Sequence, residues 1–395
     1  MAAAPPGSWR RRLGLERRVA ALASALLVYG FGEELSSRYL PAYLRAMGAS
    51  ALLIGAFGAA RDLFDAAYAW PGGVLSDRLG TRRALLLFGG LSTAGFAIYL
   101  AWGSPAGVFV GLAFVMAWRS LGLPATFALI GVELDVRRRI AGFTVQAVLK
   151  RIPIVVAPPL GGLLLERLGV RSGMRIGFAV AILLSLVMLV RLSRALGTEE
   201  DAPARGGIPV PERVRLHPLL RQLLIADCLV RLCEGLPDVF LVLWAIEVVH
   251  VSPSQFGVLT AILTATAIVS YFPAAVLAGR AEKKPFVVLT YVFFSLFPLA
   301  VVLSRSFAAL AAAFVLGGLR EIGEPARKAL IVDLSDPGAR GRTVGLYYAI
   351  RGFSVAGAAA IGGGLWTVRP ALTFVVAAVL GLVGTSWAAL FLRPR

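Results

Sequence analysis

The amino-acid sequence predicts an all-α membrane protein whose twelve transmembrane helices form two pseudo-symmetric halves of six. Three observations favour this fold class. Only 16% of the 395 residues are charged and 58% are hydrophobic, whereas soluble domains carry charge on about a quarter of their residues. Apolar runs of transmembrane length recur along the whole chain. Polar residues in the first half of the chain recur in the second half at one constant offset.

Twelve apolar runs have the length that a helix needs to cross about 30 Å of hydrocarbon. Backbone groups in lipid must be bonded within their own segment, so we expect helices and no open sheet. The first six runs lie near residues 19–44, 50–75, 84–103, 106–132, 141–166 and 173–194. The second six lie near residues 220–249, 254–279, 286–304, 307–333, 342–367 and 371–392.

A charged stretch with proline and glycine separates the two sets of runs and predicts a linker. The expected domains are an N-terminal six-helix half at 1–194, a cytoplasmic linker at 195–219 and a C-terminal six-helix half at 220–395. Lysines and arginines concentrate in the loops of one side, which places both termini in the cytoplasm. The first run contains Glu33 and Glu34, unlike the short uncharged core of a cleaved signal peptide, so it is expected to be retained.

Several function classes are excluded. The net charge of +18 does not indicate nucleic-acid binding, because the basic residues lie in short loops and form no continuous basic face. Cys228 and Cys233 lie in an apolar run, so neither a disulfide nor a metal site is expected. Neither histidine, His217 nor His250, is placed to activate a serine or cysteine, and no G-x-x-x-x-G-K loop for ATP is present. We therefore expect no enzyme and no cofactor.

The two halves of the chain repeat each other at an offset of 201 residues. The segment RSLGLPA at 119–125 recurs as REIGEPA at 320–326. Parallel halves of this kind are found in transporters that bind substrate near the bilayer midplane, between the halves. The coincident pairs are Glu33 with Glu234, Arg119 with Arg320, Gly122 with Gly323, Pro124 with Pro325, Asp135 with Asp336, and Gly161-Gly162 with Gly362-Gly363.

The segment 72–83, read GGVLSDRLGTRR, is predicted to be a polar loop between the second and third helices. Gly73 and Gly80 would permit a tight turn, and Asp77 could accept hydrogen bonds from a neighbouring helix N-terminus. The G-x-x-x-D-R-x-G spacing resembles the signature between helices two and three of the major facilitator superfamily of secondary transporters. The resemblance implies alternating access, with a conformational latch made by Gly73, Asp77, Arg78, Gly80 and Arg82.

Two further features resemble a subset of this superfamily, the proton-coupled exporters and antiporters. Arg119 resembles the arginine that many proton-coupled exporters of the superfamily carry in helix 4. The segment APPLGG at 157–162 resembles the G-P-x-x-G-G signature of antiporters, with Ala157 in place of the first glycine. Small residues here and at the repeated positions let helices approach closely. The expected packing residues are Pro158, Gly161, Gly162, Gly362 and Gly363.

Many ionisable residues fall inside the apolar runs. Each costs about 2.5–3.5 kcal/mol there, so each is expected to face the bundle interior or a water-filled cavity. Arg327, near a helix end, is expected to be structural or to reach the interface, and an ion pair that only holds the bundle together is the alternative for any single residue. The expected proton-coupling residues are Glu33, Glu34, Asp62 and Asp65. The expected substrate-cavity residues are Arg119, Asp227, Arg231, Glu234, Asp238, Arg320, Glu321, Glu324 and Arg351.

Arg119 and Arg320 are expected at similar depth, where two cations facing one cavity repel each other. Glu321 and Glu324 lie beside Arg320 in helix 10, whereas helix 4 must borrow a carboxylate from helix 1 or helix 2. We therefore expect Arg119 to be the less neutralised of the two arginines and the more directly involved in exchange of substrate or protons.

The favoured function is a proton-coupled exporter of a small molecule in the plasma membrane, the inner membrane of a bacterium. Its partners are then the small-molecule substrate, protons and the lipid bilayer, and it is expected to be a monomer. One alternative is an importer or facilitator of an anionic or zwitterionic metabolite, which the symmetric arginines would suit. Another is a membrane receptor or scaffold that transports nothing.

Overall fold

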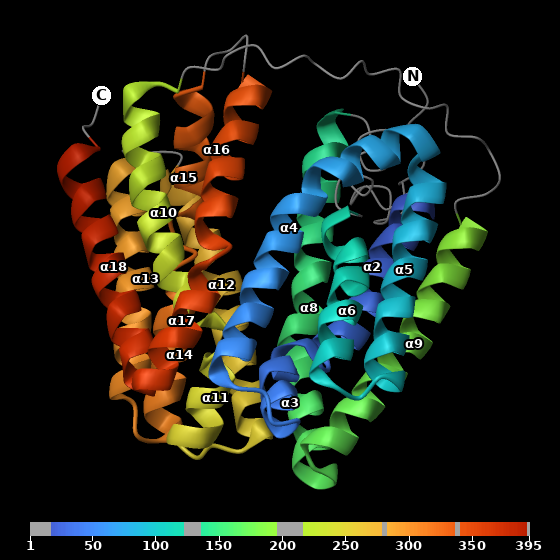
Figure 1. The fold of residues 1–395 in the computed structure, drawn as a ribbon. Helices are drawn as coiled ribbons and strands as arrows, with labels where there is room; N and C mark the ends of the chain where they lie inside the picture. The colour runs from blue at the N-terminus through green and yellow to red at the C-terminus, as the bar shows by residue number, and fades with distance from the viewer. Residues whose placement is uncertain (1–16, 122–135, 196–215, 279–282, 336–339, 393–395) are drawn as a thin grey trace, which may run out of the picture. The chain divides into compact units, whose positions relative to one another are not determined.

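The protein is described by a computed structural model that covers residues 17–121, 136–195, 216–278, 283–335 and 340–392 (Figure 1). Every regular element in these ranges is a helix, which confirms the expected all-α fold. Six of the described helices are long and apolar enough to cross a membrane on their own: Arg82–Ala101, Val170–Ala195, Pro253–Ser270, Lys283–Leu303, Thr343–Val368 and Pro370–Phe391. The other expected runs also contain helices, but these are interrupted or carry more charge.

The chain forms two compact units. The first unit contains Met1–Arg38 and Ala67–Ile208, and the second contains Tyr39–Ala66 and Pro209–Arg395. The first part of the second expected helix thus belongs to the same compact unit as the C-terminal residues. The division into halves at 1–194 and 220–395 stays a prediction from the internal repeat.

The first unit is built around α2, which packs against α8 and α9, while α5 packs against α6 and α9. Small residues permit these contacts: a side chain at Gly32 of α2 would meet the backbone of Ala181 in α9. The elements are α2 (Arg17–Glu34), the later part of α4 (Ala51–Leu79), α5 (Thr81–Ala101), α6 (Pro105–Met116), the π-helix η2 (Ala117–Leu121), α8 (Val136–Leu168) and α9 (Val170–Ala195).

The second unit is built around α10, which packs against α16, α17 and α18, and α13, which packs against α14, α15 and α18. The unit begins at Tyr39, the last residue of the short helix η1 (Ser37–Tyr39), and α3 (Leu40–Ala46) then precedes α4. The remaining elements are α10 (Pro218–Asp238), α11 (Leu241–Leu243), the π-helix η3 (Trp244–Val248), α12 (Pro253–Ala278), α13 (Lys283–Leu303), α14 (Phe307–Leu319), α15 (Glu324–Asp333), α16 (Arg340–Val355), α17 (Ala358–Val368) and α18 (Pro370–Phe391).

Several helices that the sequence predicts as continuous are interrupted. The first expected helix breaks after Glu34, the seventh after Asp238, and the eleventh at residues 356–357. The tenth breaks at 320–323, where Pro325 falls in the first turn of α15 and Gly323 N–H donates to Thr290 Oγ1 at 2.6 Å. Proline lacks the N–H that would continue a helix, so its position at a new helix start explains this last break.

The polar loop predicted at 72–83 is wrong in its extent. Helix α4 continues to Leu79 and α5 begins at Thr81, so a single residue, Gly80, connects them. The φ angle of Gly80 is 77°, a backbone conformation that glycine adopts without steric cost. One left-handed residue is enough to turn the chain, so the flanking polar residues stay helical and keep their backbone hydrogen bonds.

Glycines at 362 and 363 allow α17 to pack closely against two helices of the second unit. A side chain at Gly362 would collide with the carbonyl oxygen of Leu236, and one at Gly363 would lie 2.7 Å from the carbonyl oxygen of Ala51. These contacts fit the expectation that small residues bring backbones together. The first-half counterparts Pro158, Gly161 and Gly162 lie within the single helix α8.

Candidate functional site

Four of the expected site residues lie where the helices are irregular. Glu34 and Asp238 are the last residues of α2 and α10, Arg119 lies inside the π-helix η2, and Arg320 follows the end of α14. Interrupted helices and π-bulges are frequent at functional sites, because they free backbone groups and redirect side chains. The repeat-related arginines at 119 and 320 therefore share an irregular backbone setting as well as a sequence motif.

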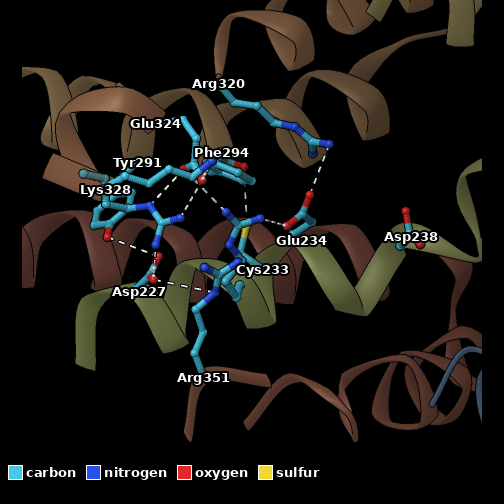
Figure 2. Close-up of polar contacts among 12 residues, drawn as sticks. Asp227, Cys233, Glu234, Asp238, Tyr291, Phe294, Arg320, Glu324, Lys328 and Arg351 are labelled. Carbon is cyan, nitrogen blue, oxygen red and sulfur yellow. Dashed lines mark hydrogen bonds and ion pairs between the residues drawn. The ribbon is translucent and has the colours of Figure 1, made fainter. Parts of the chain in front are cut away.

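Asp227 of α10 is the centre of a buried polar cluster in the second unit (Figure 2). Its side chain is 1% exposed, as is that of Arg327, whose Nη1 donates to Asp227 Oδ2 at 2.5 Å. The hydroxyl of Tyr347 donates to the same oxygen at 3.0 Å, and that of Tyr291 donates to Oδ1 at 3.3 Å. Donors from α13, α15 and α16 thus hold one carboxylate, which is the condition for keeping a charge buried.

Ion pairs extend from this carboxylate in two directions. On one side, Arg351 of α16 places Nε 3.6 Å from Asp227 Oδ2. On the other side, Arg327 donates to both oxygens of Glu324, from Nε at 2.9 Å and from Nη2 at 2.6 Å. This two-bond geometry fixes the orientation of the guanidinium as well as its charge.

The network continues from Glu324 along α10. Arg231 Nη2 lies 3.8 Å from Glu324, and its Nη1 donates to Glu234 at 2.5 Å. Arg320 Nη2 lies 3.1 Å from the second oxygen of Glu234. These contacts join seven side chains of alternating sign, here named the charge chain: Arg351, Asp227, Arg327, Glu324, Arg231, Glu234 and Arg320. It begins and ends on an arginine.

Aromatic rings lie over three of the four arginines of the charge chain. The guanidinium carbons of Arg231 and Arg320 lie 5.1 and 5.0 Å from the ring centroid of Phe294, and that of Arg351 lies 5.2 Å from the ring of Tyr348. Cation–π contacts of this kind stabilise a guanidinium by about 0.5–2 kcal/mol without neutralising its charge. Arg231, Arg320 and Arg351 thus have an aromatic contact in addition to their carboxylate partners.

The first part of α4 adds a second group of charges to the same unit. Arg61 donates from Nη2 to Asp238 at 2.6 Å and to Asp62 at 3.2 Å. Asp65, the other acidic candidate of this helix, lies on its exposed side. In the same unit, Arg45 Nε of α3 donates to Glu247 of η3 at 3.0 Å.

In the first unit, Glu33 and Arg119 face each other. Arg119 Nη1 lies 3.8 Å from Glu33 Oε1, with the arginine side chain 45% exposed and the carboxylate 14% exposed. A carboxylate from helix 1 thus lies beside Arg119, as the sequence led us to expect. The adjacent Glu34 instead accepts from Arg38 Nε at 3.2 Å and from Ser37 at 3.4 Å.

A buried hydroxyl pair lies one turn before Glu33. The hydroxyls of Tyr29 and Ser92 are 2.5 Å apart, and Ser92 also donates to the carbonyl of Val115 at 3.1 Å. The hydroxyl of Tyr99 is buried and has no hydrogen-bond partner among the described residues. Buried polar groups are normally bonded, so this hydroxyl marks a place where water or a polar ligand group would be favoured.

The residues expected to form the latch lie at the end of α4 and the start of α5. Gly73 and Asp77 are in the helical part of α4, but their side chains lie outside the described residues. Arg78 is exposed, and the buried Nε of Arg82 has no hydrogen-bond partner in the described part of the chain. Their role as a latch stays a prediction.

One expectation about helix 10 is wrong. Arg327 was expected to be structural or to reach the membrane interface, and its buried ion pair with Asp227 fits the first of these alternatives. Glu324 was expected to neutralise Arg320, but it bonds Arg327 and lies near Arg231, while Arg320 pairs with Glu234 of α10. The break at 320–323 separates Arg320, which follows the end of α14, from Glu324, the first residue of α15, so the two residues do not share one continuous helix.

Sequence reasoning also missed the tyrosines at 291 and 347. No motif marks them, since an isolated tyrosine in an apolar helix is normally a packing residue. Arg327 was named from the sequence as a structural or interfacial residue and not as a cavity residue. No group of histidine, cysteine and acidic residues suited to a metal ion occurs among the residues that the structure describes.

Comparison with known proteins identifies the family. The sequence profile of the Major Facilitator Superfamily matches residues 22–230 and 223–395. The chain belongs to this superfamily. No curated protein matches the chain. A member of the superfamily is a membrane transporter rather than an enzyme, and its apolar helices make it a multi-pass membrane protein.

Solved structures of transporters share the fold. A peptide transporter POT in complex with alafosfalin is 18% identical, with a TM-score of 0.73 over 94% of this chain and 93% of that one. A bacterial homologue of the human lysosomal transporter Spinster, inward-facing and occupied, is 15% identical, with a TM-score of 0.72 over 98% and 97%. The human organic anion transporter MFSD10 is 18% identical, with a TM-score of 0.64 over 94% and 99%. At these identities the likeness is one of fold alone.

Proposed function

We propose that this secondary transporter is a proton-coupled exporter of a small molecule, with Glu33 and Arg119 as its coupling pair. The observation that carries the proposal is the distance of 3.8 Å between Arg119 Nη1 and Glu33 Oε1. The carboxylate is largely buried and the arginine is half exposed. A group that can change its charge thus lies beside a cation that can reach a ligand.

The pair couples two binding events through competition. Ionised Glu33 attracts Arg119, whereas protonated Glu33 does not, so a proton on Glu33 frees the arginine for other partners. A substrate that binds Arg119 weakens its hold on Glu33 in return, because coupling between two sites is reciprocal. Each proton that crosses the membrane then supplies about 2.3 kcal/mol per 100 mV to the transport cycle.

Glu33 is favoured over the other carboxylates because it is the least engaged of the buried ones. Glu34 is bonded by Arg38 and Ser37, and Asp62 is bonded by Arg61. Asp65 lies on the exposed side of α4. A proton carrier must exchange its proton during the cycle, which a carboxylate fixed by local bonds does less readily.

Export is the favoured direction because Arg119 and the segment 157–162 resemble proton-coupled exporters. We also infer that the protein acts as a monomer in the plasma membrane, the inner membrane of a bacterium, with both termini cytoplasmic. The loop arginines support this orientation. The alternative of an importer of an anionic or zwitterionic metabolite is supported by the arginines of the charge chain.

The test is transport in proteoliposomes with an imposed pH gradient, using each compound that raises the melting temperature of the purified protein. Glu33→Gln should abolish proton-driven accumulation and preserve exchange of labelled for unlabelled substrate. Glu166→Gln, a change at an exposed glutamate of the same unit, is the matched control and should behave like the wild type. Accumulation that survives in Glu33→Gln would exclude Glu33 as the coupling residue, and the sign of the gradient that drives accumulation gives the direction.

A further inference from the structure

The Arg351 end of the charge chain is incompletely paired. The distance from Arg351 Nε to Asp227 Oδ2 is 3.6 Å. Arg327 and Tyr347 already donate to that oxygen at 2.5 and 3.0 Å. Its Nη1 is buried and has no hydrogen-bond partner among the described residues. Arg351 is therefore the cation that the local carboxylates satisfy least.

The surroundings of Arg351 make this deficit costly. Its side chain is only 17% exposed, and the ring of Tyr348 covers its guanidinium at 5.2 Å. A second cation, Arg327, donates to the same oxygen of Asp227 and so lies close to Arg351. A buried cation with an unbonded N–H and a like charge beside it is stabilised strongly by a bound anion.

The number of charges in the charge chain also indicates an excess of positive charge. It contains four arginines and three carboxylates, linked so that both ends are cationic. The other end, Arg320, has Glu234 at 3.1 Å and two phenylalanine rings near it. Lys328, the further cation near Glu324, is 59% exposed and so is compensated by water.

The buried Nε atoms of Arg231 and Arg320 also lack a partner among the described residues. Both arginines, however, lie closer to a carboxylate oxygen, at 2.5 and 3.1 Å, than Arg351 does at 3.6 Å. Arg351 is therefore the most weakly paired arginine of the charge chain.

We propose that Arg351 binds an anionic group of the transported molecule, a carboxylate, phosphate or sulfonate, through its free Nη1–H. This assignment rests on the proposed transport function and gives the chemical class of its substrate. A guanidinium presents its N–H groups in a planar fork that suits oxyanions. Figure 2 shows Arg351 reaching from α16 toward Asp227, so a bound anion would compete with Asp227 for the same cation.

Such competition leaves the rest of the cluster intact. Asp227 keeps Arg327, Tyr291 and Tyr347 when Arg351 turns to an anion. The helix α16 ends at Val355, four residues after Arg351, so the arginine lies next to an interruption that can absorb a small shift. Anion binding therefore moves one side chain of α16 while α10, α13 and α15 stay joined.

The experiment measures the melting temperature of the full-length protein in phosphatidylcholine nanodiscs. Sodium sulfate and sodium phosphate are the probes, each compared with sodium chloride at equal ionic strength. Both probes should raise the melting temperature of the wild type. Arg351→Gln should raise the anion concentration that gives half of this effect at least tenfold. Arg369→Gln, a change at an exposed arginine of the same unit, should respond as the wild type does.

An equal response of Arg351→Gln and wild type would overturn the proposal, as would the absence of any response to both probes in the wild type. Without anion, Arg351→Gln should melt at or above the wild-type temperature, because it removes a poorly paired cation. If that variant fails to fold, Arg351→Lys, which keeps the charge but loses the fork, should still weaken binding, and unchanged binding would count against the proposal.

The proposed function is tested separately by proton-driven flux. Glu33→Gln should lose flux and keep the response to sulfate, whereas Arg351→Gln should lose the response to sulfate. Flux of a neutral or cationic compound with no response to either anion would overturn the anion site and leave proton coupling intact. A response to anions without proton-driven flux would overturn proton coupling and leave the anion site intact.

Discussion

Replacing Asp227 by asparagine should be one of the most destabilising single changes in the second unit. The carboxylate is 1% exposed and receives Arg327 at 2.5 Å and two tyrosine hydroxyls at 3.0 and 3.3 Å. Removing one partner of a buried ion pair costs about 3–5 kcal/mol. Arg327 keeps its two bonds to Glu324, so we expect a loss near the lower limit, about 3 kcal/mol.

The assay is thermal unfolding of the purified variants in one detergent. At roughly 2–4 °C per kcal/mol for a unit of this size, Asp227→Asn should lower the melting temperature by about 6–12 °C. Lys328→Gln removes a 59% exposed partner of Glu324 and should change stability by no more than about 0.5 kcal/mol. A double variant with Tyr347→Phe should lose less than the sum of the two single changes. Equal melting temperatures for Asp227→Asn and Lys328→Gln would refute the central role of the buried carboxylate.

Arg119→Ala should abolish transport more completely than Arg320→Ala, and Arg320→Ala should lower the melting temperature more, because Arg320 is 17% exposed and paired at 3.1 Å whereas Arg119 is 45% exposed; flux and melting of both purified variants check this ranking. Arg61→Asp should be destabilising, and adding Asp238→Arg should restore part of the loss, because the two side chains bond at 2.6 Å; melting of the single and double variants measures their coupling. Gly80→Ala should cost about 1–2 kcal/mol, since its φ of 77° is unfavourable for any residue with a side chain, and thermal unfolding measures this loss.

Each of these predictions has its own control or contrary result. The reverse ranking of the two arginines would assign the exchange role to the second-half arginine. No recovery in the charge-swapped pair would mean that the 2.6 Å contact contributes little. Gly90 lies inside α5 with no atom within 4 Å of an added side chain, so Gly90→Ala should be neutral or stabilising, and an equal loss at both glycines would exclude strain as the cause.

Hydropathy was sufficient to predict the helices, because a backbone in a bilayer must form its hydrogen bonds within its own segment and a helix does so. Each of the twelve expected runs contains helix, and the boundary errors lie mostly at the ends. The interruptions could not be predicted, because they depend on tertiary contacts such as the hydrogen bond from Gly323 N–H to Thr290. The loop at 72–83 was misjudged for a related reason: polar residues can stay helical beyond the membrane when one glycine makes the turn.

The candidate site was predicted as a set of residue types but not as a set of contacts. Charges in apolar segments must face the interior, and this rule alone selected six of the seven members of the charge chain. The rule does not say which charge pairs with which. Arg327 was expected to be structural or to reach the interface, and its position near a helix end does not reveal that Asp227 of α10 is its partner.

The charge chain also constrains how the protein is made. Helix α10 is not among the described helices that are apolar enough to cross a membrane alone, and its Asp227, Arg231, Glu234 and Asp238 would together cost about 10–14 kcal/mol in lipid. The arginines that neutralise Asp227 and Glu234 from other helices lie at 320, 327 and 351, and the ribosome adds them roughly 90 to 120 residues later, at about 5–20 residues per second. During those seconds α10 is expected to wait at the membrane surface or beside the insertion machinery, and to enter the bilayer only when its later partners arrive.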